Sequence, residues 1–290
     1  MHFIKEEAAN YQKMFADSTV IQGDCASALA NLPSDFFRCC ITSPPYWGLR
    51  DYGDANQIGA EHKLSDYIER LSRIFDQVYR VLAPDGSLWL NLGDSYTSGN
   101  RGYRAPDKKN PVRAMSYRAK TPDGLKEKDL IGVPWRLAFA LQDRGWYLRS
   151  DVIWEKPNCM PESVKDRPTR SHEYLFLLTK SSKYYYDREA VKEANGRNRR
   201  TVWSISTEPY SGAHFATFPT SLIEPCLLAG SKPGDWILDP FLGSGTTGLV
   251  CEKHSRKYVG IELVDEYVQL AVNRIRGTER ELFSTTTGVA

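Results

Sequence analysis

The sequence lacks the features that mark several common classes of protein. Its six cysteines include no Cys-x-x-Cys pair and its five histidines never adopt the HExxH spacing, so neither a disulfide framework nor a metal site is expected. No run approaches the roughly 18 apolar residues that cross a bilayer, and the first residues, MHFIKEEAANYQK, contain no signal-peptide core. We therefore predict a cytoplasmic protein that binds no metal and makes no membrane contact.

A large net charge is also lacking, because the formal value is only +2. The charge is unevenly distributed, however: residues 95–128 hold nine Lys or Arg and three acidic residues in a stretch rich in Gly, Pro and Ser. Segments of this length without apolar periodicity are functional loops or unstructured excursions. Taken alone, this one fits a solvated surface loop as well as a contact with a polyanion.

Apolar periodicity predicts strands that alternate with helices. Strands are expected at 19–21, 36–42, 87–92, 146–154, 174–179, 236–239 and 258–263. Helices are expected at 25–32, 64–82, 133–144 and 265–276, with another that follows a glycine-rich turn and ends at about 254. Pro84-Asp85-Gly86 predicts a turn before the third strand. This alternation is typical of an α/β fold with a largely parallel sheet. Cys39 and Cys40 should point to opposite faces of that sheet as small buried hydrophobes.

A glycine-rich segment, DPFLGSGTT at 239–247, joins a predicted strand to a predicted helix. Glycines there permit a tight turn, and the helix N-terminus offers free N–H groups to an anion. The next strand ends at Glu262, where an acidic side chain can accept the ribose hydroxyls of an adenosine-containing cofactor. A loop that needs glycine only for its geometry remains the alternative. Dinucleotide GxGxxG and GK[ST] spacings are absent, whereas S-adenosylmethionine, with its carboxylate, would suit the loop.

The second motif is Ser43-Pro44-Pro45-Tyr46, directly after a predicted strand. Together with the glycine-rich loop it closely resembles the signature of amino-methylating DNA methyltransferases, which transfer the methyl group of S-adenosylmethionine to an exocyclic nitrogen of cytosine or adenine. Residues 146–187 resemble the central stretch of the cytosine-N4 and related enzymes. Residues 214–225 resemble the segment that precedes the cofactor loop in that family.

The resemblance implies a Rossmann-like class I methyltransferase sheet in a single catalytic domain, 1–290. The order of motifs implies a circular permutation, because SPPY precedes the cofactor loop and residues 19–24 must supply the third strand. Two inserted regions are expected: a basic DNA-contacting loop at 95–130 and a small target-recognition region at 156–213. The implied cofactor-binding residues are Asp24, Phe218, Pro219, Asp239, Pro240, Phe241, Gly243, Ser244, Gly245, Thr246 and Glu262.

The chemistry explains why such an enzyme would need SPPY. An exocyclic amino group is a poor nucleophile, and acceptors around its two hydrogens favour the geometry needed for attack. We expect Ser43 Oγ and the Pro44 carbonyl to be those acceptors, Pro45 to help fix them in place, and Tyr46 to stack on a flipped-out base, with Trp47 adding to the pocket.

Ser rather than Asp at position 43 favours cytosine N4, by resemblance to the family. Adenine-N6 methylation stays open as the main alternative, and a catalytically silent DNA-binding relative or methylation of RNA or a protein amide as lesser ones. The expected partners are duplex DNA, a cognate restriction endonuclease and a second copy of the chain. Lys156 fits a DNA contact or an ordinary solvated charge. Cys226, although it follows Pro225, is predicted to be a core residue.

Overall fold

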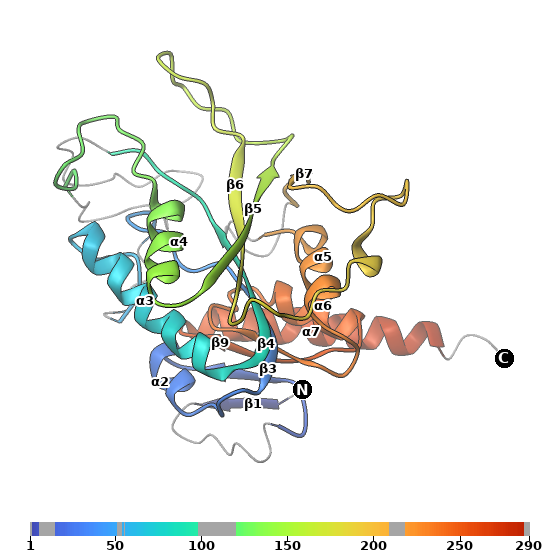
Figure 1. Cartoon of the computed structure of the whole chain (residues 1–290). Coiled ribbons are helices and arrows are strands. Elements are labelled where there is room, and N and C mark those ends of the chain that lie inside the picture. Colours follow the sequence, from blue (N-terminus) through green and yellow to red (C-terminus); the bar gives the residue numbers. More distant parts are fainter. Residues whose placement is uncertain are drawn as a thin grey trace.

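The structure is a computed structural model that describes residues 2–5, 15–50, 54, 56–97, 120–208 and 218–286, with 2–5 and 278–286 described by their backbone alone. Its strands form one nine-stranded sheet in the order β1-β2-β9-β8-β3-β4-β6-β5-β7 (Figure 1). Their bounds are β1 His2–Lys5, β2 Thr19–Gln22, β3 Phe37–Thr42, β4 Leu82–Leu92, β5 Tyr147–Glu155, β6 His172–Thr179, β7 Val202–Ser204, β8 Trp236–Asp239 and β9 Lys257–Glu262. The α/β prediction is confirmed.

The centre of the sheet joins strands that are far apart in the chain. β8 pairs with β3 on one side and with β9 on the other, and β9 pairs with β2. All of these pairings are parallel, so the segments after β3, β8 and β9 leave the sheet at the same edge. The predicted permuted order therefore brings residue 43 next to the loop after residue 239.

Helices cover both faces of the sheet. On one face lie α2 (Cys25–Ala30), α3 (Leu64–Val81) and α4 (Val133–Asp143), and on the other α5 (Thr220–Gly230), α6 (Thr246–Lys253) and α7 (Asp265–Thr286) (Figure 1). Alternation along β3 separates the two cores: Cys40 packs with the first layer of helices, and Cys39 and Ile41 pack with the second. The prediction for the two cysteines is confirmed, and Cys226 is fully buried in α5.

Four features differ from the sequence prediction. The expected turn at Pro84-Asp85-Gly86 lies inside β4, where the register with β3 shifts between Phe37 and Cys39 and so accommodates the extra residues as an irregularity. β6 runs antiparallel to both β4 and β5, although the other pairings are parallel. The short edge strands β1 and β7 were not predicted, because three or four residues carry too little periodicity. α7 continues past the expected end near residue 276.

Two predicted absences can be compared with the described residues. Within them, no helix combines the length and the apolar character needed to cross a bilayer. The same part of the chain contains no group of three or more His, Cys, Asp or Glu side chains placed to hold a metal ion. Residues 98–119 of the predicted basic loop, and 209–213 of the predicted recognition region, lie outside the described residues.

Candidate active site

A large open cleft of about 1760 Å³ lies at the carboxyl edge of the sheet. Its walls include the segment Ser43–Tyr46 after β3 and the glycine-rich loop after β8, two motifs that are about 200 residues apart. The segment that joins β5 to β6, residues 156–171, extends away from the sheet (Figure 1) and also lines the cleft. Carboxyl-edge clefts of parallel sheets are the usual ligand sites of this fold class.

Asp239 holds the two motifs together. Its carboxylate is 1% exposed and accepts the Thr42 hydroxyl at 2.7 Å, the Thr247 hydroxyl at 2.7 Å and the Phe241 N–H at 3.1 Å. Burial raises its pKa to about 6, and the three hydrogen bonds oppose that shift. Because Thr42 directly precedes Ser43, Asp239 fixes the Ser43–Tyr46 segment against the start of α6. The structure thus places Asp239 beneath the cleft, as a positioning residue, among side chains that do not line it.

Glu262 lies at the end of β9, beside the glycine-rich loop. Its two carboxylate oxygens accept the N–H groups of Gly243 and Val264, both at 2.9 Å. Burial nevertheless raises its pKa to about 7. A carboxylate whose desolvation outweighs its hydrogen bonds is stabilised by further donors, and the two hydroxyls of a ribose are donors of that kind.

The glycine-rich loop itself is fixed from α7. Arg274 donates to the Ser244 hydroxyl at 3.0 Å and to the Thr246 hydroxyl at 2.9 Å, so these predicted cofactor residues also stabilise the loop. Gly245 has a φ of 83°, and a Cβ there would lie 2.9 Å from the Cβ of Ala271. Glycine at 245 is therefore needed for the close packing of α6 on α7, and the residue does not line the cleft.

The other predicted cofactor residues also fall into two groups, those that line the cleft and those that do not. Asp24 lines the cleft and caps α2, with its carboxylate accepting the Ser27 N–H at 3.0 Å. Phe218, Pro240, Phe241 and Gly243 also line the cleft, whereas Pro219 is buried at the start of α5 and does not. The described lining thus offers a partly buried acid, aromatic faces and backbone groups, which fits a nucleoside with a charged tail such as S-adenosylmethionine.

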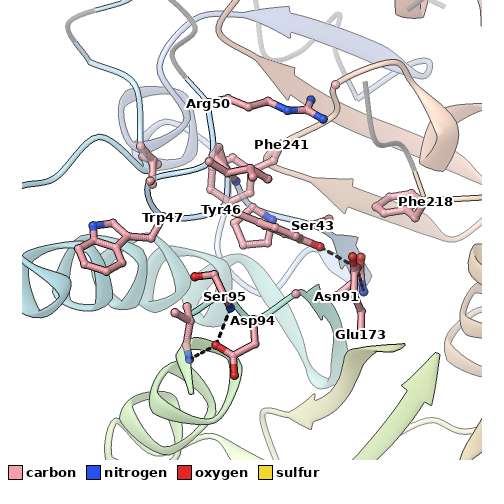
Figure 2. A pocket seen from close by; sticks show the side chains of 18 of the residues that line it. Ser43, Tyr46, Trp47, Arg50, Asn91, Asp94, Ser95, Glu173, Phe218 and Phe241 are labelled. Carbon is pink, nitrogen blue, oxygen red and sulfur yellow. Dashed lines mark hydrogen bonds between the residues drawn. The ribbon is translucent and has the colours of Figure 1, made fainter. Parts of the chain in front are cut away.

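Tyr46 is held by a hydrogen-bond network that the sequence did not predict. Its hydroxyl donates to Glu173 Oε2 at 2.8 Å (Figure 2). The same carboxylate also accepts Asn91 Nδ2 at 3.3 Å and Lys156 Nζ at 2.5 Å. Burial raises the pKa of Tyr46 well above its ordinary value, and the Glu173 charge adds to the shift. The hydroxyl therefore stays protonated and keeps donating. A Cβ at Gly93 would lie 2.7 Å from the Tyr46 ring, so glycine is required there.

The rest of the SPPYW segment is anchored from α3. The Tyr67 hydroxyl donates to the Pro45 carbonyl at 2.8 Å. The Trp47 indole donates to the Glu61 carbonyl at 2.9 Å and is 7% exposed. Figure 2 shows Trp47 directed away from Tyr46 and Ser43, so the tryptophan borders the cleft mainly as a core side chain.

Basic residues of the predicted recognition region have partners in the described structure. Lys156 belongs to the Glu173 network, with its side chain 18% exposed, and its interpretation as a solvated charge is wrong. Arg167 pairs with Glu162 at 2.6 Å and stacks on Tyr96. Arg170 lies 3.8 Å from the carboxylate of Asp94. Any DNA contact by these side chains would have to share them with acidic partners.

Asp94 is a further residue that the sequence analysis missed. Its carboxylate accepts the N–H groups of Ser95, Gly132 and Val133 at 2.9 Å each, so it caps α4 from the end of β4. The available signal was position: Asn91 lies near the end of an apolar strand, Asp94 follows that strand at the same edge as SPPY, and Glu173 lies near the start of the strand that pairs with it. The antiparallel placement of β6, which was not predicted, brings Glu173 into the cleft.

Comparisons with known proteins agree with this geometry. Residues 37–273 match the DNA methylase family of N6 and N4 methyltransferases. The type II methyltransferase M.Cfr9I of Citrobacter freundii is 65% identical over 266 residues, which cover 90% of this chain and 89% of that protein. M.SmaI of Serratia marcescens is 62% identical over 262 residues, covering 88% and 90%.

Solved structures share the fold. A PvuII DNA methyltransferase described as cytosine-N4-specific superposes with a TM-score of 0.68 at 22% identity, covering 88% of this chain and 85% of its own. A DNA modification methylase from Thermus thermophilus, solved with S-adenosyl-L-methionine, gives 0.64 at 24% identity, covering 88% and 92%.

Proposed function

Because the chain belongs to the DNA methylase family and is an S-adenosylmethionine-dependent amino-methyltransferase of DNA, we propose that its target is the N4 amino group of a cytosine flipped out of duplex DNA. The observation that carries this proposal is the position of Ser43 in the cleft. It follows directly on a strand end that Asp239 fixes through Thr42, beside the glycine-rich loop. The short side chain of Ser43 leaves space for an amino group, and its hydroxyl offers one acceptor for the amino hydrogens.

The chain's own residues would act by positioning and by accepting hydrogen bonds. When bound, the cofactor supplies an activated methyl group, so no covalent enzyme intermediate is needed. Ser43 Oγ and the Pro44 carbonyl would accept the two amino hydrogens and stabilise the positive charge that develops on nitrogen. Tyr46, held by Glu173 at 2.8 Å, would present its ring face to the base. Rigid placement of these groups reduces the reorganisation that accompanies reaction.

Cofactor placement would depend on a second set of groups. Glu262 would accept the ribose hydroxyls, Asp24 would approach the adenine, and Phe218 and Phe241 would supply apolar surface, since all four line the cleft. Pro240, Gly243, Ser244 and Thr246 would form the wall beside the tail of the cofactor. Asp239, Pro219 and Gly245 would act indirectly, by holding that wall in place.

Recognition of DNA would fall to the two inserted regions, 95–130 and 156–213. The segment 156–171 lines the same cleft as SPPY. Its length and exposure suit contact with base edges and phosphates. A cognate restriction endonuclease that cuts the same sequence, and a homodimeric state, complete the proposal; the type II designation of the relatives favours the endonuclease.

Adenine N6 is the second candidate target, because an exocyclic amino group of either base needs the same acceptors. The test is to methylate unmodified genomic DNA with isotope-labelled S-adenosylmethionine and to digest the product to nucleosides. We expect label in N4-methylcytosine. Label in N6-methyladenine would replace the proposal with its alternative, and no labelled nucleoside would support the catalytically silent relative.

A further inference from the structure

One exposed side chain in the predicted recognition region, 156–213, is unusual. Six large hydrophobic side chains of the described part are exposed, namely Leu130, Phe139, Tyr147, Met160, Tyr186 and Val202. Met160 is the most exposed of them, at 77%, and it alone among the six lines the cleft. Single exposed apolar residues are normal on a protein surface, so the position of Met160 is the feature that requires an explanation.

The backbone that carries Met160 is firmly held. Cys159 N–H donates to the Lys156 carbonyl at 3.1 Å, which closes a turn with Pro157 at its second position, where proline is favoured. Asn158 exchanges two hydrogen bonds with the backbone of Thr207, at 2.8 and 3.0 Å. Pro161 then restricts the conformation of Met160 itself.

The same turn is connected to the catalytic segment. The Lys156 N–H donates to the Ser171 carbonyl at 2.7 Å, and its ammonium group pairs with Glu173, the residue that holds Tyr46. Met160 is thus an apolar side chain on a rigid turn, four residues from a lysine that belongs to the base-stacking network. It lines the same cleft as Ser43.

We propose that Met160 is a wedge that enters the base stack of the DNA duplex and occupies the space that the flipped nucleotide leaves. This inference rests on the proposed function and adds a residue that drives base extrusion. Methionine is one of the apolar side chains that proteins insert between base steps. Its unbranched, polarizable chain adapts to the irregular gap, and its exposure in the free protein means that no packing is lost when it enters DNA.

A wedge lowers the cost of opening a paired target and should matter little when the target is already unpaired. Once the methylated sequence has been identified with the wild-type enzyme, two synthetic duplexes test this difference. One has the target base paired, and the other has an abasic site opposite it. For Met160→Ala we expect kcat/KM to fall roughly 10- to 100-fold on the paired duplex and less than about 3-fold on the abasic one.

Two matched variants control for trivial effects. Met160→Leu keeps an apolar wedge and should retain most activity on paired DNA. Phe139→Ala removes an exposed apolar side chain that lies outside the cleft and outside both inserted regions, 51% exposed on α4, and should leave both substrates unaffected. A second readout needs no turnover: 2-aminopurine at the target position, paired with thymine in the other strand, should fluoresce strongly with wild type and weakly with Met160→Ala.

Equal losses on both duplexes, or no loss on either, would overturn the wedge while leaving the proposed function intact. A wild-type enzyme that methylates no DNA would instead refute the proposed function, and the wedge with it.

Discussion

Glu173→Gln tests whether the network behind Tyr46 serves catalysis. The carboxylate receives three donors, from Tyr46, Asn91 and Lys156. A glutamine side chain has one acceptor oxygen where Glu173 has two, so one of the two strongest donors must lose its partner. Hydrogen bonds to charged groups contribute about 1.5–3 kcal/mol. Because the Glu173 and Lys156 side chains are 17% and 18% exposed, solvent screening reduces the expected loss to about 1–2 kcal/mol.

That loss should be observed mainly in the methyl-transfer step. At about 1.4 kcal/mol for each factor of ten, kcat should fall roughly 5- to 30-fold. The dissociation constant of S-adenosylmethionine should change little, because three strands of the sheet separate β6, which carries Glu173, from β9, which carries Glu262. Single-turnover transfer of a labelled methyl group measures the first quantity, and calorimetry measures the second.

A double-mutant cycle with Tyr46→Phe identifies the route of the effect. If Glu173 acts through the tyrosine hydroxyl, the two substitutions remove the same interaction. The double variant should then transfer methyl almost as fast as Glu173→Gln alone. Glu224→Gln, which disturbs an ion pair with Lys253 and His254 outside the cleft, is the matched control. Additive losses, or a Glu173→Gln enzyme within twofold of wild type, would refute the reasoning.

Three further predictions concern the two motifs. Ser43→Ala should bind cofactor normally but transfer methyl at least about 100-fold more slowly, since one transition-state acceptor is lost; near-normal turnover in a labelled-methyl assay would exclude that role. The pKa of Glu262 is raised to about 7, and ribose donors favour its ionised form, so cofactor affinity should rise about tenfold from pH 6 to pH 8. Glu262→Gln should abolish that slope in calorimetry, and a wild-type affinity independent of pH would contradict the contact. Asp239→Ala removes three buried hydrogen bonds and should lower the free energy of unfolding by about 2–4 kcal/mol in urea titration; a loss below about 0.5 kcal/mol would show that the link between Thr42 and Thr247 is dispensable.

The parts of the fold that could be predicted from the sequence have strong periodicity or demanding turns. α3 repeats apolar residues over five turns, and β3 ends at a double proline, so the limits of both elements were close to those observed. β1 and β7 have four and three residues. Elements this short are defined by pairing with a neighbour, and that information is absent from their own residues.

The site was predictable to the extent that backbone geometry dictates residue type. Gly243, Phe241 and Glu262 line the cleft as expected. Asp239 was assigned to the cofactor because it belongs to the motif, yet its carboxylate faces Thr42 and Thr247, which lie 197 and 8 residues away along the chain. Glu173 was missed for a related reason. Its role depends on the antiparallel insertion of β6 beside β4, a tertiary arrangement that the local sequence of β6 does not specify.

The bond between Thr42 and Asp239 also has a consequence for how the protein is made. The chain between the two residues must be synthesised before β3 acquires its β8 partner. At about 5–20 residues per second, an emerging chain leaves that apolar edge unpaired for roughly 10–40 s. The Ser43–Tyr46 segment therefore leaves the ribosome long before the glycine-rich loop that borders the same cleft, and the sheet can close only after β8 and β9 have followed. Methylating activity would then appear late in synthesis. The edge of β3 that has not yet paired with β8 is where a nascent chain most needs protection from pairing with another chain.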